Sequence, residues 1–311
     1  MGVDIATVAS FVIESAIQLE RIPVLGESLR GEHYYLAPGG KGTNQAVAAA
    51  RQGKRVGIVG KVGDDLYGEM AVSLYRQEGL STEGVHVTQE AKTAIGLVYV
   101  TPSGDNCIGI YMGANEKLTA TEVAAAMRTF MPARVVTAQL ESSDEAVLAA
   151  FTIAKQHGAT TLLNTAPARR VDDRIIALTD IMTPNESEAR LMAGFDAGDQ
   201  SASLEVVTTR LMEMGPKAVV LTRGSKGSIL VENGKPLREI EPYRVAAVDA
   251  LGAGDCFSGS LAVALSEGKD IADAARWATV AAALSTLGRG GIAPLPSRPE
   301  VEDHLERYGQ Q

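Results

Sequence analysis

Cysteine is nearly absent from this chain of 311 residues, which contains only Cys107 and Cys256. Two cysteines cannot form a disulfide framework, and no CxxC pair or cysteine–histidine spacing predicts a structural zinc site. The N-terminus shows neither a charged leader nor an apolar signal core, and no uninterrupted apolar run reaches the roughly 18 residues that a membrane span requires. These absences predict a soluble protein of the reducing cytoplasm.

Positive charge is also in short supply. The 38 acidic residues outweigh 29 lysines and arginines and leave a formal net charge of −9. No segment gathers basic residues into a stripe, so a nucleic-acid surface is not expected. We therefore expect small molecules as partners, with no nucleic acid and no membrane.

Two common nucleotide-binding motifs are missing. A dinucleotide-binding dehydrogenase would carry GxGxxG directly after its first strand, but residues 9–16 read ASFVIESA. The Walker A pattern GxxxxGK[ST] occurs nowhere in the chain. Any nucleotide site must therefore be built in another way.

Strand-like and helix-like patterns alternate through most of the chain. Apolar runs with strand character lie at 4–11, 56–59, 135–140 and 160–164, and stretches of helical spacing separate them. This alternation favours a central, mostly parallel sheet flanked by helices. The expected fold class is therefore α/β, with ligands bound beyond the carboxyl ends of the strands.

Two segments, 12–38 and 92–113, break this rhythm with short, partly exposed strand-like runs. We expect them to form a small β-sheet lid within a single domain that spans 1–311. Because unpaired strand edges seek partners, the lid also suggests a homodimer that pairs through it.

The first of two glycine-rich turns is GGKGTNQAVAAARQG at residues 39–53. Lys41 and Asn44 stand where an alanine-rich helix begins, so their polar groups can face a ligand above it. Taken alone, this turn is explained better by close packing than by binding.

The second glycine-rich turn lies between a strand predicted to end near Val248 and a helix that begins with Gly252, Ala253, Gly254 and Asp255. Free backbone N–H groups and the helix dipole at such a start can hold an anion. Asp255 could accept a proton from an alcohol there, and an ordinary carboxylate pKa near 4 would leave it ionised at neutral pH. A cap for the helix is an equally good explanation of this aspartate alone.

Polar side chains follow several predicted strands. Glu141 follows VVTAQL, Asn164 ends TTLLN, Asn185 follows DIMTP and Thr222 ends AVVLT. Each residue alone fits a capping or turn role at least as well as a ligand role. Their common position at one sheet edge, together with Asp255, predicts a binding site.

Four segments in this order resemble the ribokinase family, the PfkB-type carbohydrate kinases. They are GGKGTNQAVAAAR at 39–51, TPNESEA, LTRGSKG and VDALGAGDCFSGSLAVAL at 248–265. The resemblance can be followed over essentially the whole chain. It implies a ribokinase-like fold and ATP-dependent phosphorylation of a hydroxymethyl group on ribose or a close relative.

The resemblance also implies roles for single residues. Asp255 is the implied base, and the implied anion hole is Gly252, Ala253 and Gly254. The implied sugar-binding residues are Glu14, Gly40, Lys41, Asn44 and Glu141. The implied ATP-binding residues are Asn185, Thr222, Gly224, Gly227 and Thr279.

Two cations are implied as well. Magnesium (Mg2+) is expected to bridge the phosphates near Asn185 and Glu188, with water between these side chains and the ion. A monovalent cation, potassium (K+), is expected to bind mainly to backbone carbonyls in a set made of Asp249, Leu251, Thr286, Arg289 and Gly291.

The chain departs from the family pattern after the first strand. Ribokinases carry Asn-x-Asp there, with both side chains on the sugar, whereas this chain has Val12, Ile13 and Glu14. Valine removes a donor and an acceptor, and Glu14 extends the carboxylate by one methylene, so the accepted hydroxyl pattern should change. Ala250 also replaces the usual threonine of the cation loop.

Two alternatives to a pentose kinase stay open. A kinase of the same fold could act on a nucleoside, a ketose or a sugar acid. A non-catalytic sugar-binding regulator would keep Lys41, Asn44 and Glu141 but would not need Asp255 or its glycine turn, so their presence favours an enzyme.

Overall fold

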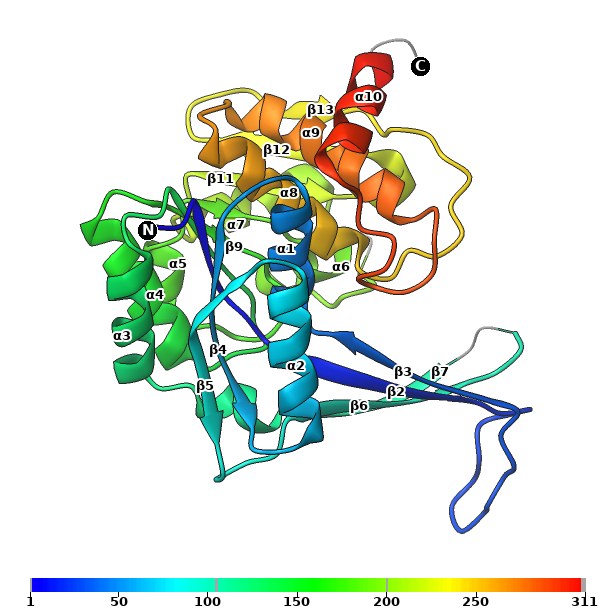
Figure 1. Ribbon diagram of the computed structural model, residues 1–311. Coiled ribbons are helices and arrows are strands. Elements are labelled where there is room, and N and C mark those ends of the chain that lie inside the picture. The colour runs from blue at the N-terminus through cyan, green and yellow to red at the C-terminus, as the bar shows by residue number, and fades with distance from the viewer. Residues whose placement is uncertain (1, 104–105, 200, 309–311) are drawn as a thin grey trace.

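The computed structural model describes residues 2–103, 106–199 and 201–308, and within them nine strands form the main sheet (Figure 1). From edge to edge their order is β13, β12, β11, β10, β9, β8, β1, β4, β5. The bounds are β1 Ile5–Val8, β4 Val56–Gly63, β5 Ser81–Thr88, β8 Val135–Ala138, β9 Thr160–Leu163, β10 Ile181–Met182, β11 Ala218–Thr222, β12 Ser228–Glu232 and β13 Arg238–Ile240. Neighbours from β11 to β5 run parallel, and β12 and β13 are added antiparallel at one edge.

Helices cover both faces of this sheet, which is why the strands of β1 and β4 are buried along their whole length. The helices that pack on one face are α1 Lys41–Arg51, α2 Leu66–Gln77, α8 Ala253–Ser266, α9 Ile271–Ser285 and α10 Arg298–Tyr308. Those that pack on the other are α3 Ala120–Phe130, α4 Asp144–Gln156, α5 Asp173–Ala177, α6 Glu186–Met192 and α7 Leu204–Glu213. Short 3-10 helices lie at Gly113–Lys117 and Gly224–Lys226. Across the described residues, the helices are too short or too polar to cross a membrane.

Successive residues of a strand pack into opposite layers. Ile5 belongs to the hydrophobic cluster beneath α1 and α8, and its neighbour Ala6 belongs to the cluster beneath α3 and α4. This alternation is what the period of a strand requires when both faces are covered. The predicted α/β class with a mostly parallel sheet is confirmed.

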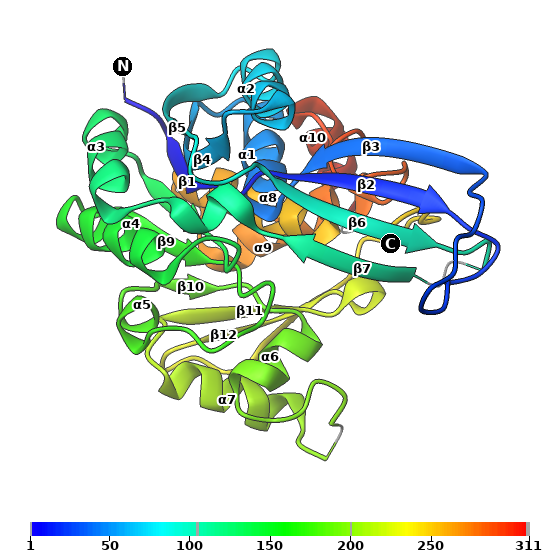
Figure 2. The ribbon, with the colours of Figure 1, turned by 90° about the horizontal axis from the view of Figure 1, so that it is seen from below.

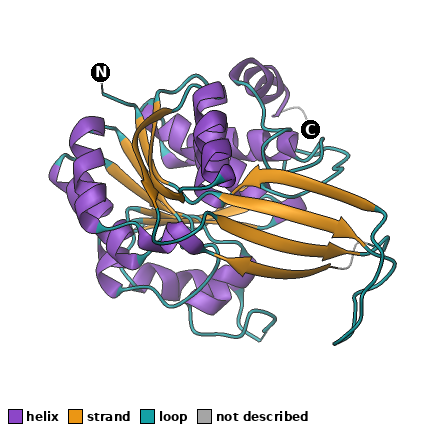
Figure 3. Cartoon of the chain, turned by 60° about the horizontal axis from the view of Figure 1, so that its bottom comes forward, coloured by secondary structure: helices purple, strands orange, loops and turns teal. Residues whose placement is uncertain are grey.

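A second, four-stranded sheet projects away from the main body (Figures 2 and 3). Its order is β3 His33–Gly39, β2 Val12–Gln18, β6 Ala94–Val100 and β7 Asn106–Tyr111. β2 and β6 pair in parallel at its centre, and β3 and β7 are antiparallel edges. The predicted small sheet is confirmed, whereas its action as a lid stays a prediction.

The prediction of a strand that leads into the helix of Asp255 is wrong. The last strand of the sheet, β13, ends at Ile240, and the chain then runs to α8 without regular structure. Val248 is 60% exposed, and its N–H donates to the carbonyl of Thr286 at 2.7 Å rather than to a strand. The apolar run before the glycine turn is therefore a loop beside α9, because the sheet edge lies elsewhere.

Helices α1 and α8 pack unusually close together. A Cβ atom on Gly259 of α8 would lie 2.4 Å from the backbone oxygen of Gln45 and 3.0 Å from its Cα on α1. Those atoms belong to the backbone and cannot move aside as a flexible side chain would. A residue without a side chain is therefore needed at this crossing.

We expect Gly259→Ala to destabilise the protein by about 1–3 kcal/mol, the usual cost of overpacking a core. The better helix propensity of alanine offsets only about 1 kcal/mol of that cost. Urea denaturation measures the change, with Gly109→Ala as the control, because no atom lies within 4 Å of the Cβ position there. Equal stability of the two variants would show that the helices can separate freely.

Candidate active site

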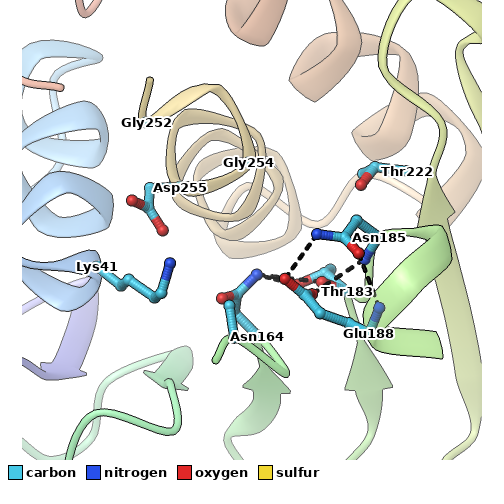
Figure 4. Close-up of a pocket in the computed structure, with 10 residues that line it drawn as sticks. Lys41, Asn164, Thr183, Asn185, Glu188, Thr222, Gly252, Gly254 and Asp255 are labelled. Carbon is cyan, nitrogen blue, oxygen red and sulfur yellow. Dashed lines mark hydrogen bonds between the residues drawn. The ribbon is translucent and has the colours of Figure 1, made fainter. Parts of the chain in front are cut away.

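The candidate site is a pocket of about 170 Å³ where the strand ends meet the starts of α1 and α8 (Figure 4). Asn164 and Thr183 directly follow β9 and β10, and Thr222 is the last residue of β11. The lining residues are Lys41, Asn164, Ala166, Thr183, Asn185, Glu188, Thr222, Gly252, Gly254 and Asp255. The predicted edge of the sheet is thus the one where these polar groups gather.

Asp255 lies in the first turn of α8 and is only 8% exposed. The side-chain amide of Asn44 donates to its Oδ2 at 2.9 Å, and that of Gln45 donates to its Oδ1 at 3.5 Å. Burial raises the pKa of Asp255 to about 6, although the charge of Lys41 and the Asn44 hydrogen bond act in the opposite direction. The expectation of an ordinary carboxylate pKa near 4 is therefore corrected, because the site withholds water from this group.

The turn before Asp255 has the shape of an open helix start. Gly252 adopts a φ of 75°, and a Cβ atom on it would lie 3.0 Å from the backbone of Gly291. A Cβ atom on Gly254, which lines the pocket, would have no atom within 4 Å. The backbone at the start of α8 is therefore open to a ligand, at the end of the helix that favours negative charge.

Lys41, the first residue of α1, reaches into the same pocket (Figure 4). Burial works against its charged form, but the carboxylates of Asp255, Glu141 and Glu188 outweigh burial and raise its pKa. The pocket therefore holds a fixed positive charge between the helix start and the strand ends.

Glu141 and Gly40 join Lys41 and Asn44 beside the base. Glu141 accepts hydrogen bonds at Oε2 from the hydroxyl of Ser10, at 2.5 Å, and from the N–H of Lys41, at 2.9 Å. Gly40 has a φ of 101°, and a Cβ atom there would lie 2.6 Å from the carbonyl oxygen of Ser10. Asn44 keeps a buried Oδ1 with no partner among the described residues. Acceptors of this kind are suited to the hydroxyls of a small polyol.

Glu14 lies apart from this group, on β2 of the small sheet, and the hydroxyl of Tyr35 on β3 donates to its Oε1 at 3.0 Å. Burial, the bond to Glu14 and the charge of Asp249 together raise the pKa of Tyr35 to about 12. Val12 is two residues before Glu14 and shares its face of the strand. Sequence reasoning missed Tyr35, because only the pairing of β2 with β3 brings it to Glu14.

Only some of the residues expected to bind the nucleotide lie in this pocket. Asn185 and Thr222 line the pocket, whereas Gly224, Gly227 and Thr279 do not. Gly224 and Gly227 form the turn between β11 and β12, with φ values of 55° and 79°. The hydroxyl of Thr279 donates to the carbonyl of Ala275 one turn earlier in α9, at 2.8 Å.

A comparison with known protein families identifies the family of this chain. Residues 4–298 match the pfkB family carbohydrate kinases. The chain belongs to the PfkB family of carbohydrate kinases. The predicted family and the predicted class of enzyme, an ATP-dependent carbohydrate kinase, are both confirmed.

Two curated relatives show the breadth of the match. The ribokinase of Haemophilus influenzae is 34% identical over 281 residues, which cover 90% of this chain and 91% of that protein. The deoxyribokinase of Salmonella typhi is 30% identical over 303 residues, which cover 97% of this chain and 98% of that protein.

Two solved structures share the fold. The structure of the ribokinase from Giardia lamblia has a TM-score of 0.90 at 31% identity and covers 99% of this chain and 100% of its own. The Arabidopsis thaliana ribokinase complexed with ribose and ATP has a TM-score of 0.89 at 26% identity and covers 98% of this chain and 99% of its own. The ribokinase-like fold is therefore confirmed.

In this PfkB kinase, Asn185 and Glu188 form a reciprocal cap at the start of α6. Asn185 Oδ1 accepts the N–H of Glu188 at 2.8 Å, and Glu188 Oε2 accepts the N–H of Asn185 at 3.1 Å. No group of three or more histidine, cysteine, aspartate or glutamate side chains in the described part of the chain could hold a metal ion. An ion here would keep most of its own waters, as Mg2+ usually does.

The segments expected to hold a monovalent cation come together in this kinase. Asp249 accepts the N–H groups of Leu251 and Gly290, each at 3.0 Å, and so ties the loop before α8 to the loop after α9. The carbonyl of Thr286 accepts the N–H groups of Val248 and Asp249 at 2.7 and 3.1 Å. Of the expected carbonyls, that of Thr286 is therefore the one already engaged.

Asn164, expected at this edge only as one of the polar residues that follow strands, and Thr183, which was not predicted, both line the pocket. Asn164 Nδ2 donates to the carbonyl of Thr183 at 3.1 Å and to the hydroxyl of Ser258 at 3.3 Å. Its Oδ1 is buried and has no partner among the described residues. Its position at the end of a strand predicted Asn164 at this edge, whereas no comparable signal marks Thr183 in the sequence.

We expect Asp255→Asn to lower turnover by roughly two to four orders of magnitude, the usual range for loss of a positioned base. The fold and ATP binding should persist, because the amide has the shape of the carboxylate. A coupled ADP assay and calorimetric ATP binding measure the two effects.

The matched control is Asp270→Asn, an exposed cap at the start of α9 whose function asparagine can keep. Turnover of Asp255→Asn within a few-fold of the control would remove Asp255 from the mechanism.

Proposed function

We propose that this PfkB kinase phosphorylates a pentose, transferring the γ-phosphoryl group of ATP to the hydroxymethyl group of ribose or a close relative. The observation that carries the proposal is one pocket that joins a buried carboxylate, Asp255, to a lysine charge and an open helix start. Relatives named ribokinase and deoxyribokinase, and a related structure with ribose and ATP, support the substrate class.

The chemistry that we propose for the site is mainly alignment and charge. Phosphoryl transfer has a loose transition state, so stabilising charge on the moving group matters more than covalent catalysis. Asp255 accepts the proton of the sugar hydroxyl as the new bond forms. The amides of Gly252, Ala253 and Gly254 and the charge of Lys41 stabilise the phosphoryl oxygens.

The sugar would lie between α1 and the small sheet. Asn44 Oδ1, which lacks a partner, and Glu141 Oε1, which is not used by Ser10 or Lys41, would accept sugar hydroxyls. Gly40, Lys41 and Glu14 would complete the sugar site. Gly40 leaves room for close approach, and Tyr35 fixes the carboxylate of Glu14.

ATP would lie over the ends of β10 and β11, with Asn185 and Thr222 at its phosphates and Gly224, Gly227 and Thr279 farther along the nucleotide. The unpartnered Oδ1 of Asn164 and the carboxylate of Glu188 fit a largely hydrated Mg2+, which needs few protein ligands. When bound, Mg2+ would neutralise charge on the phosphates. Asn185 and Glu188 would hold its waters.

We further propose that the small sheet is a lid of one kinase domain spanning 1–311 and that two copies pair through it as a homodimer. The sheet exposes a set of large apolar side chains, Tyr34, Tyr35, Leu36, Leu97, Tyr99, Ile108, Ile110 and Tyr111. Such a surface favours burial against a partner. The low cysteine content and the charge of −9 support work in the cytoplasm, without nucleic acid or membrane partners. A monomer in analytical ultracentrifugation at micromolar concentration would exclude the dimer.

Turnover of ATP across a panel tests the substrate class. The panel is ribose, 2-deoxyribose, fructose, a sugar acid and adenosine. The proposal predicts the highest kcat/KM for a pentose. A higher kcat/KM for the ketose, the sugar acid or the nucleoside would assign the enzyme to that substrate class instead. Binding without turnover of any compound would indicate a regulator.

We expect potassium to activate the kinase, because a cation held by Asp249 and the carbonyls of Leu251, Arg289 and Gly291 would order the loop before α8. Thr286 would contribute least, since its carbonyl is engaged. Rates in potassium chloride and in a bulky organic chloride at equal ionic strength measure the effect. Equal rates in both salts would count against a cation site.

We expect Val12→Asn and Glu14→Asp together to shift relative kcat/KM toward ribose by roughly tenfold, because each buried hydroxyl left without a partner costs about 1–3 kcal/mol. Both changes are needed, since the two side chains share one face and a shorter carboxylate no longer reaches Tyr35. Val12→Asn alone is the control. If the native enzyme already prefers ribose and the double variant keeps that preference, these residues do not determine the sugar specificity.

A further inference from the structure

Two buried glutamines connect the main sheet to Asp255. Gln139, which directly follows β8, donates its Nε2 to Gln45 Oε1 on α1 at 2.7 Å. Gln45 donates its own Nε2 to Asp255 Oδ1 on α8 at 3.5 Å. Both glutamines are 1% exposed, so water does not compete for these groups. Three separate elements thus meet in one chain of side-chain amides that ends on the carboxylate.

The direction of the hydrogen bond from Gln139 determines which end of the Gln45 side-chain amide faces Asp255. A side-chain amide has a donor end and an acceptor end of nearly equal shape, so its orientation is set by its neighbours. Gln139 presents an N–H to Gln45 and thereby holds its oxygen. The opposite orientation would place an amide oxygen against the carboxylate of Asp255, which is unfavourable when that group is charged.

A glycine makes room for the amide of Gln139. A Cβ atom on Gly42 would lie 2.6 Å from Gln139 Oε1 and 2.4 Å from the Cα of Ala9. Gly259 instead lets the backbone of Gln45 approach α8, because a Cβ atom there would lie 2.4 Å from the backbone oxygen of Gln45. Packing alone could have been satisfied by apolar residues without this polar chain.

We propose that Gln139 is a positioning residue which, through Gln45, holds the carboxylate of Asp255 ready to accept the proton of the substrate. This inference rests on the proposed role of Asp255 as base. Gln45 touches the base and orients it directly, and Gln139 acts only by fixing the amide of Gln45.

The groups that surround Asp255 determine in which direction its pKa would move if the Gln45 donor were lost. Burial raises its pKa, Lys41 from α1 lowers it, the side-chain amide of Asn44 lowers it, Glu141 after β8 raises it, and Gln45 lowers it. Its neighbour Cys256 stays neutral, because burial raises the pKa of that thiol to about 12. Loss of the donor from Gln45 should therefore move the pKa of Asp255 upward and make the base protonated over a wider range of acid pH.

Gln139→Met and Gln45→Met test this, each singly and both together, because methionine keeps the volume and removes the amide. The pH dependence of kcat/KM reports the base in the free enzyme. From the pKa of Asp255 we expect the acid limb to lie near pH 6 in the native enzyme and to move up by about half a unit to one unit in each variant. The double variant should match Gln45→Met alone, because the two residues act in series.

Gln52→Met is the matched control. Gln52 is a buried glutamine that caps the other end of α1, where it binds the Trp277 ring N–H and the hydroxyl of Ser260, each at 2.7 Å. It should lower the melting temperature without moving the acid limb. An equal shift in Gln52→Met, an unmoved limb in Gln139→Met, or additive shifts in the double variant would each overturn the proposal.

Gln139→Asn serves if the methionine variant does not fold, since its amide is one methylene too short to reach Gln45, and the same shift is expected. The role of the base fails separately. If Asp255→Asn keeps both its turnover and its acid limb, the base is another group, whatever the glutamine variants show.

Discussion

The contact between α1 and α8 is the constraint on which the rest of the site depends. Gly259 lets the two backbones approach until a Cβ atom would lie 2.4 Å from Gln45 O. That approach sets Asn44 within 2.9 Å of Asp255, so a hydrogen bond to the base itself joins the proposed sugar-binding helix to the proposed catalytic helix. The strand ends of the parallel sheet then supply the remaining polar groups beneath both helix starts.

Placing the base at this contact has a cost that the surrounding groups offset. Burial, together with the charge of Glu141, drives the pKa of Asp255 upward, and it reaches about 6 even with Lys41, Asn44 and Gln45 favouring the charged form. A carboxylate with this pKa is ionised at neutral pH yet accepts a proton more readily than an exposed one. The same burial keeps water from the reacting groups, which a kinase needs so that phosphate is not lost to hydrolysis.

The sequence predicted those features of the fold and the site that depend on residues close together in the chain. The βα alternation, the small sheet and the two glycine turns with Lys41, Asn44 and Asp255 could be read from the sequence, because each depends on residues close in the chain. Tyr35 beside Glu14, and Gln139 beside Gln45, could not, since strand register and helix packing bring these pairs together across 21 and 94 residues. The strand predicted before Asp255 was wrong because an apolar run does not show whether a sheet edge is near it.

The position of the new phosphate ester tests the central claim most directly. After turnover of ATP with a pentose, the proton-coupled phosphorus NMR spectrum of the product shows how many protons lie on the esterified carbon. Transfer to a hydroxymethyl group held against Asp255 predicts a triplet, from the two protons of a CH2–O–P group. A doublet from a secondary ester, or inorganic phosphate with unchanged sugar, would contradict the account.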